Sequence, residues 1–462
     1  MHALRLLAAA VVLLAATNLY GEIPNSSSAD PQPVSAPVAA AKVDSGDTAW
    51  LLMSAAMVML MTPGLAFFYG GLVRKKNVLS ILMQCFMVLC IISLQWALFG
   101  YSIAFGPTVR GLFGGLDWAG LAGVGGEPNT TYAATVPHLA FMIFQMMFAV
   151  ITPGLIIGAF AERMKFAGFC LFAVLWATLV YDPVAHWVWG AGGFMGMVAD
   201  PISGAKGWGA LDFAGGTVVH INAGAAALAA ALVLGKRQGY PAGRISPPHN
   251  LPVAVLGAAL LWFGWFGFNA GSALAAGSLA TFAFVSTHLA TAAAGLAWSL
   301  LDWLKHGKPT TLGMITGAVA GLVAITPASG FVTPMGAIAI GLGAGLVCWL
   351  SVTYMKVKFG YDDSLDAFGV HGVGGMFGAL ATGLFATTAV NAAGANGLFY
   401  GNPAQLWIQL KAVLLTVIYS FTASLVLLKL VDALVGLRVC DHDERVGLDL
   451  TQHREAGYTV ID

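Results

Sequence analysis

Two histidines lie inside apolar stretches of this sequence, and they are its first candidates for chemistry. His220 lies in DFAGGTVVHINAG (212–224), and His371 lies in DAFGVHGVGG (366–375). An imidazole donates, accepts and exchanges protons near neutral pH. Because an ionisable side chain is costly to bury in an apolar environment, the two histidines indicate a path for a substrate or a proton. Hydrogen-bonded packing and a haem held by both histidines are alternatives, and a catalytic metal is disfavoured without Cys or carboxylate ligands nearby.

Small residues lie near both histidines at helical spacing. Gly216 and Gly224 lie one turn before and after His220, and Gly375 lies one turn after His371. Such neighbours either let another backbone approach or leave space beside the imidazole. The many other glycines of the chain indicate close helix packing and no chemistry.

The composition indicates that these histidines lie in a membrane protein. The chain of 462 residues is 58% hydrophobic and 9% charged, and its mean hydropathy is +0.81. This leaves too little polar surface to cover a soluble protein of that size. Because basic and acidic residues are equal in number, at 21 each, no nucleic-acid partner is expected. The five cysteines show no CxxC spacing and are expected to be ordinary thiols.

Eleven apolar stretches are long enough to cross a bilayer as helices. They are 48–73, 78–105, 137–160, 166–190, 214–234, 250–272, 278–303, 311–328, 333–355, 368–388 and 405–436. Basic residues such as Arg74, Arg163 and Lys236 lie in alternate loops, whereas the opposite loops contain only Arg110 and Lys206. The positive-inside rule therefore predicts an N-terminus outside and a C-terminus inside.

Eleven spans divide into two halves of five and one further helix. Two consecutive halves of five spans point in opposite directions, so an internal repeat is inverted in the membrane plane. His220 falls in span five and His371 in span ten, which are equivalent places in the two halves. We therefore predict an all-α integral membrane fold in which an approximate two-fold axis brings the two imidazoles together. The last stretch, 405–436, is longer than a bilayer requires and is expected to tilt as a lipid-facing strap.

Longer motifs resemble one known family. They are AFFYGGLVRKKNVLS (66–80), GAFAERMKF (158–166), DFAGGTVVHINAG (212–224), PPHNLP (247–252), GWFGFNAGSA (264–273), DAFGVHGVGG (366–375) and VGLRVCDHDERVGLDL (435–450). In this order they resemble bacterial ammonium transporters of the Amt/MEP/Rh family over nearly the whole chain after residue 48. The resemblance implies a homotrimer in the cytoplasmic membrane with one narrow apolar pore in each protomer, no cofactor and no enzymatic activity.

The resemblance assigns four residues to the pore. His220 and His371 match the family's twin histidines, and Phe148 and Phe268 match its two stacked gating phenylalanines. Beyond such a gate the path is too apolar for a bare cation. Ammonium can lose a proton there, whereas potassium, which is similar in size, cannot shed its charge. Because burial keeps both imidazoles mostly neutral, the pair is expected to pass or share one proton while ammonia moves separately.

Four further residues match the outer end of the pore. Trp189, Phe144 and Ser272 match the family's ammonium recruitment site, and Asp212 matches an aspartate that supports it. Aromatic faces attract a cation, and a serine oxygen accepts an N–H hydrogen bond, so these groups suit ammonium. Without the resemblance, the aromatic residues would be interpreted as packing and Asp212 as a helix N-cap.

The two ends of the chain differ from its apolar middle. Residues 1–41 combine a short apolar run with a Ser/Pro/Ala-rich stretch, and they are expected to be a signal peptide and a disordered leader. Residues 48–436 would form the eleven-helix transporter domain, and 437–462 a cytoplasmic regulatory tail. The family pattern implies that the tail packs under the trimer and responds to a PII-type signalling protein, although Val446 stands where a glutamate is usual.

Two other functions stay open at this point. An ammonium sensor with little flux would bind at the same outer site and signal through the tail, but the sequence contains no kinase-like or cyclase-like domain. An electroneutral gas channel of the Rh type is disfavoured by the set formed by Trp189, Phe144 and Ser272.

Overall fold

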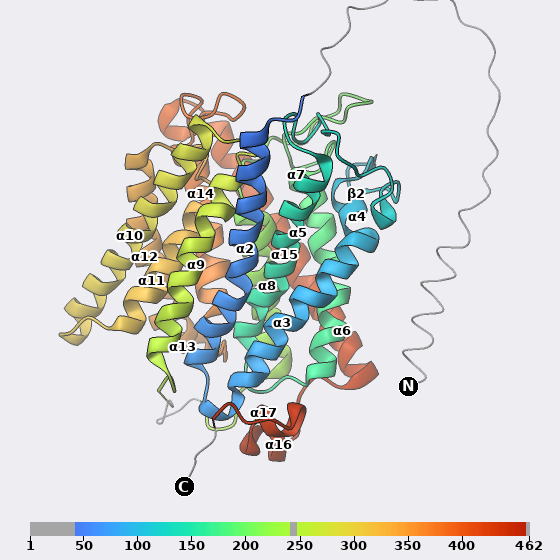
Figure 1. Ribbon diagram of the computed structural model, residues 1–462. Coiled ribbons are helices and arrows are strands. Elements are labelled where there is room, and N and C mark those ends of the chain that lie inside the picture. The colour runs from blue at the N-terminus through green and yellow to red at the C-terminus, as the bar shows by residue number, and fades with distance from the viewer. Residues whose placement is uncertain (1–41, 241–246, 459–462) are drawn as a thin grey trace, which may run out of the picture. The chain divides into compact units, whose positions relative to one another are not determined.

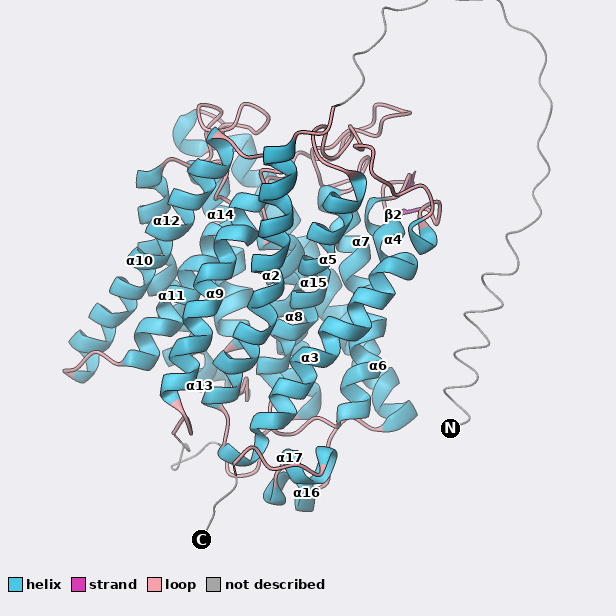
Figure 2. Cartoon of the chain, viewed as in Figure 1, coloured by secondary structure: helices cyan, strands magenta, loops and turns pink. Residues whose placement is uncertain are grey.

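The computed structural model describes residues 42–240 and 247–458, and the expected leader, residues 1–41, lies outside them. Long helices run side by side through the described part of the chain (Figure 1), and loops connect them at the two ends of the bundle (Figure 2). The one sheet among the described residues is a short antiparallel pair, β1 (Thr108–Val109) and β2 (Phe113–Gly114). The all-helical class expected from the sequence is therefore confirmed.

The first half of the bundle contains the predicted spans one to five. Its helices are α2 (Ser45–Leu72), η1 (Lys75–Asn77), α3 (Val78–Gln95), η2 (Trp96–Gly100), α4 (Tyr101–Phe105), η3 (Ala119–Leu121), α5 (His138–Phe160), α6 (Phe166–Trp176), η4 (Ala177–Tyr181), α7 (Asp182–Trp189), η5 (Gly216–Ile221) and α8 (Asn222–Leu234). The segments η2 and η4 are π-helical turns inside otherwise continuous spans, and η5 is a π-helical turn at the start of its span. Such turns are rare and often occur at functional sites.

The second half continues in the same way. Its helices are α9 (Leu251–Gly271), α10 (Ser278–His306), α11 (Thr311–Ile325), α12 (Pro334–Leu350), η6 (Ser351–Met355), α13 (Lys356–Phe359), η7 (Phe368–Gly372), α14 (Val373–Phe385), η8 (Leu398–Tyr400), α15 (Pro403–Val435), α16 (Asp441–Val446) and α17 (Leu448–His453). Here η6 and η7 are π-helical turns, and η7 leads into α14 as η5 leads into α8.

Ten helical spans of the described chain are long and apolar enough to cross a membrane. The predicted stretch 311–328 forms α11, an apolar helix of 15 residues, which is shorter than an untilted span normally requires. Each predicted stretch therefore corresponds to one apolar helix. The chain is an all-helical, multi-pass membrane protein, and its described residues form ten or eleven apolar spans.

Burial differs strongly between these spans. In the most apolar 18 residues of each span, 94% are buried in α5 and 83% in the span Gly216–Leu234. The corresponding share in α15 is 33%. The two most buried spans therefore form the centre of the bundle. α15 is the least buried of these spans, and a row of polar residues lies on its buried face. These are Gln405, Gln409, Thr416, Ser420 and Ser424.

Candidate functional site

The two histidines that were expected to meet are in contact. His220 lies in η5 and His371 in η7, at the start of two different spans. Their Nδ1 atoms are 3.3 Å apart, and the rings stack with centroids 5.3 Å apart and planes inclined by 22°. Because a hydrogen bond between these atoms needs one donor and one acceptor, the pair shares one proton between its Nδ1 atoms. The Nε2 atom of His220 is buried and has no hydrogen-bond partner among the described residues.

Close backbone contact between the two spans makes this pairing possible. A Cβ added to Gly224 would lie 2.2 Å from the Cα of Gly372, and one added to Gly375 would lie 3.0 Å from the Cβ of His220. Non-bonded carbon atoms prefer a separation of roughly 3.5–4.0 Å, so only glycine fits at position 224. Of the two possibilities considered for the small neighbours, backbone approach is the one observed.

An aspartate caps the start of each histidine-bearing span. The carboxylate of Asp212 accepts four hydrogen bonds from the backbone N–H groups of residues 215–218, at 2.6 to 3.1 Å. The carboxylate of Asp363 accepts three from residues 367–369, at 2.8 to 3.4 Å. A negative charge at this position stabilises the unpaired N–H groups and the positive end of a helix. Both π-helical turns therefore begin on an anchored backbone.

Sequence reasoning identified Asp212 and missed Asp363. The available signal was spacing, because each aspartate lies eight residues before its histidine. Burial raises the pKa of Asp212, although its backbone donors oppose the shift. Burial and the charge of Asp366 raise the pKa of Asp363 to about 6, although Lys356 and the capped N–H groups oppose this.

Phe148 and Phe268 form the ring contact expected from their positions. Their centroids are 4.2 Å apart with planes inclined by 31°, and both side chains are buried. Phe268 also stacks with His220 at a centroid distance of 6.0 Å, and Trp265 stacks with the same imidazole at 5.3 Å. The phenylalanine pair therefore adjoins the histidine pair directly.

Two residues of the expected recruitment site, Phe144 and Trp189, contact Phe148, and the third, Ser272, contacts the backbone of Phe268. The ring of Phe144 lies 5.0 Å and that of Trp189 5.9 Å from the ring of Phe148, centroid to centroid. The indole N–H of Trp189 donates to the backbone carbonyl of Asp212 at 2.9 Å, which fixes the orientation of the indole. The Ser272 hydroxyl donates to the carbonyl of Phe268 at 2.9 Å, so its oxygen can still accept a hydrogen bond.

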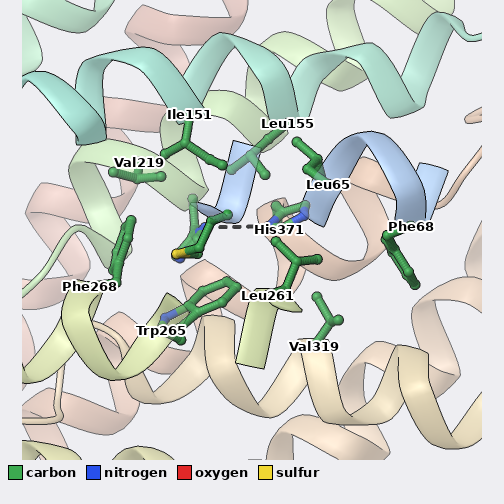
Figure 3. A pocket seen from close by; sticks show the side chains of 12 residues that line it. Leu65, Phe68, Ile151, Leu155, Val219, Leu261, Trp265, Phe268, Val319 and His371 are labelled. Carbon is green, nitrogen blue, oxygen red and sulfur yellow. Dashed lines mark hydrogen bonds between the residues drawn. The ribbon is translucent and has the colours of Figure 1, made fainter. Parts of the chain in front are cut away.

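A narrow cavity runs beside the histidines (Figure 3). Apart from the two imidazoles and the Trp265 indole, its walls are aliphatic, phenylalanine or methionine side chains. They are Met61, Leu65, Phe68, Ile151, Leu155, Val219, Leu261, Phe268 and Val319. The indole N–H of Trp265 is already donated to Thr326, at 2.8 Å. The imidazoles are therefore the polar groups that this cavity offers to a ligand.

His371 also lines a second, wider cavity whose far wall is charged. There Glu162 accepts from the guanidinium groups of Arg74 and Arg237 at 2.9 and 3.3 Å, and Arg237 also pairs with Asp362 at 2.8 Å. Burial opposes ionisation of Glu162, but the two arginine charges outweigh it, and its pKa lies below its ordinary value. No group of three or more His, Cys, Asp or Glu side chains in residues 42–240 and 247–458 could hold a metal ion.

The chain is similar to known proteins over most of its length. Residues 49–458 match the model of the Ammonium Transporter Family. The chain is 54% identical over 413 residues to an ammonium transporter of Bacillus subtilis, covering 89% of this chain and 98% of that protein. The crystal structure of Saccharomyces cerevisiae Mep2 superimposes with a TM-score of 0.79 at 36% identity, covering 87% of this chain and 90% of that one. A structure described as a sensor Amt protein superimposes with a TM-score of 0.79 at 31% identity. The match covers 88% of this chain and 98% of that one. The chain belongs to the ammonium transporter family.

Proposed function

We propose that this chain takes up ammonium across the cytoplasmic membrane by deprotonating it and passing ammonia and the proton separately. The observation that best supports this is the 3.3 Å contact between His220 and His371 beside an apolar cavity. A packed imidazole pair serving only stability would have its nitrogens paired within the protein. Here the buried Nε2 of His220 has no partner among the described residues, and it accepts an N–H hydrogen bond from a ligand in the tautomer whose Nδ1 carries the shared proton.

Recruitment of NH4+ would involve Phe144 and Trp189, which contact Phe148, and Ser272, which contacts the backbone of Phe268. Two ring faces attract the cation through their quadrupoles, and the Ser272 oxygen accepts one N–H bond. Phe148 and Phe268 would form the gate, because their rings lie in contact with each other and Phe268 adjoins His220. Asp212 would support this site by holding the Trp189 indole through its carbonyl and the His220 helix through its carboxylate.

Selectivity would follow from charge. An unpaired ion is expelled from an apolar path, so NH4+ passes only if it releases its proton and continues as NH3. We propose that the released proton is relayed through His220 and His371 and rejoins NH3 beyond them. One positive charge then crosses for each ammonium. Potassium has no proton to release and stays outside.

The same proposal includes topology and assembly. We propose eleven spans with the N-terminus outside, two inverted five-helix repeats, a homotrimer, and a leader of residues 1–41. Two features support this arrangement: matched aspartate caps precede His220 and His371, and α2 begins at the end of the bundle opposite to α16 and α17 (Figure 1). The segment after residue 436 would be a regulatory tail that responds to a PII-type protein.

Current recording on proteoliposomes tests the mechanism. Purified protein should give an ammonium-dependent current whose integrated charge matches the ammonium taken up. Liposomes without protein control for diffusion of ammonia through the lipid. Ammonium uptake without charge movement would refute separate transfer of a proton and favour an electroneutral channel.

A sensor with little flux is the second candidate. It would use the same recruitment residues, and a sensor Amt protein shares the fold. The identity of 54% to a bacterial ammonium transporter, against 31% to that sensor, favours transport. Growth of a transporter-deficient cell on limiting ammonium separates the two, because a sensor without flux would not restore growth.

A further inference from the structure

The last span holds the backbone that leads into the His220 helix. Gln409 of α15 is buried, and its side-chain oxygen accepts the N–H of Leu211 at 2.7 Å while its amide nitrogen donates to the carbonyl of Leu211 at 2.8 Å. The same nitrogen donates to the carbonyl of Ala379, in the His371 span, at 3.1 Å. One amide thus fixes both backbone groups of the residue before Asp212 and ties them to the second histidine-bearing span.

A second contact holds the other end of the segment that runs from Leu211 to Asn222. The hydroxyl of Ser420 donates to the carbonyl of Asn222 at 2.7 Å, and both residues are buried. Gln409 and Ser420 are eleven residues apart on α15, and Leu211 and Asn222 are eleven residues apart on their segment. The last span therefore holds the segment that contains Asp212 and His220 at each of its two ends.

We propose that Gln409 is a positioning residue for the ammonium recruitment site, acting through the backbone at Leu211 and Asp212. The proposal rests on the proposed function of Trp189. The carbonyl of Asp212 accepts the Trp189 N–H, so a displacement of this backbone rotates the indole that faces the cation. Gln409 itself lies outside the cavity beside the histidines, and it acts only through these contacts.

Two variants of Gln409 test this role in the full chain. Gln409→Met keeps the length of the side chain and removes every hydrogen bond, while Gln409→Glu keeps the acceptor for Leu211 N–H and loses the donors. Both should raise the KM of the ammonium current about tenfold while Vmax stays within about twofold. Ser424→Ala is the matched control, because Ser424 is also buried on α15 but bonds the indole of Trp176. It should leave KM unchanged.

A double-mutant cycle tests the route of action, because residues that act through one another have non-additive effects. In Trp189→Phe the ring has no N–H for Asp212 to accept, so Gln409→Met should then raise KM by about twofold or less. A full tenfold effect in that background would overturn the proposal. So would a wild-type KM in both Gln409 variants, or a loss of Vmax and thermal stability with KM unchanged.

Hydrogen exchange gives a reading that does not depend on flux. The N–H groups of residues 215–218 are held by Asp212, and their exchange should speed up about tenfold in Gln409→Met but not in Ser424→Ala. Unchanged exchange of these N–H groups in Gln409→Met would show that the hydrogen bonds between Gln409 and Leu211 do not hold this backbone. Absence of ammonium current in the wild-type protein would instead refute the proposed function.

Discussion

At the scale of single residues, the histidine pair could be predicted because two ionisable side chains in apolar runs are conspicuous in the sequence. Their contact followed from equivalent span positions, and the structure places their Nδ1 atoms 3.3 Å apart. Asp363 and Gln409 could not be found in this way. Asp363 lies outside the apolar stretches, and only its spacing of eight residues to His371, which repeats that of Asp212 to His220, pointed to it. Gln409 matters through a contact with Leu211 that no local pattern encodes.

The proposed selectivity rests on the neutral imidazoles. In His220→Asp or His371→Glu, a carboxylate would stabilise a cation directly, so the requirement for deprotonation would weaken. We expect the preference for ammonium over potassium to fall at least tenfold, which corresponds to about 1.4 kcal/mol. Currents in potassium and in ammonium measure this ratio. His306→Gln, an exposed histidine at the end of α10, should keep the wild-type ratio, and unchanged selectivity in both pore variants would argue against the mechanism.

The cap at Asp363 predicts a dependence on pH. Burial and the charge of Asp366 raise its pKa to about 6, and only the ionised carboxylate accepts all three N–H bonds. Transport should therefore fall as the pH on the tail side drops through about 6. The free energy of unfolding should instead rise as the pH falls from about 6 towards about 4. The reason is that the folded state binds this proton more tightly than the unfolded state.

Asp366→Asn provides the test of that assignment. Removing the nearby negative charge leaves Lys356 to favour the ionised form, so the pKa of Asp363 should fall. The midpoint of the pH profile should move to lower pH. A midpoint that stays in place would show that another group titrates.

At the scale of elements, hydropathy predicted the spans, whose ends differ from those in the structure by a few residues. It could not predict the π-helical turns at His220 and His371, because these depend on where aspartate caps and neighbouring backbones hold the chain. The strap was predicted only in part. α15 is the least buried span, but the buried amide and hydroxyl groups of Gln409 and Ser420 hold the His220 segment.

The close approach of the two histidine-bearing spans predicts a severe effect at one glycine. A methyl group in Gly224→Ala would lie 2.2 Å from Gly372, so the two histidine-bearing spans must separate. We expect a loss of about 1–3 kcal/mol in unfolding free energy and the loss of most ammonium current. Gly295→Ala in α10 is the control, because its methyl group would meet its nearest neighbour at 3.4 Å. Thermal unfolding and current measure both effects, and a fully active Gly224→Ala protein would contradict the role of this contact.

At the scale of the whole molecule, α16 and α17 lie beneath one end of the helix bundle (Figure 1), and their contacts bind distant loops together. Glu444 accepts the backbone N–H of Gln238 at 2.6 Å and pairs with Arg438 at 2.8 Å, while Asp449 accepts the N–H of Ser80 at 2.8 Å. The sequence indicated a polar tail after residue 436. It could not indicate this docking, because Gln238 and Ser80 lie far from the tail in the chain.

These contacts predict that the tail can be released by one substitution. Glu444 is buried, and Glu444→Ala leaves the Gln238 N–H and part of the Arg438 charge without a partner, which costs about 1–3 kcal/mol of local stability. Hydrogen exchange in residues 441–453 should speed up about tenfold or more, and ammonium current should fall because the loop at Gln238 borders the wider cavity. Glu455→Ala removes an exposed carboxylate from the same tail and should change neither reading. If Glu444→Ala speeds up exchange but leaves the ammonium current unchanged, the tail does not control transport and the proposed regulatory role is refuted. If exchange is unchanged, Glu444 does not hold the tail in place.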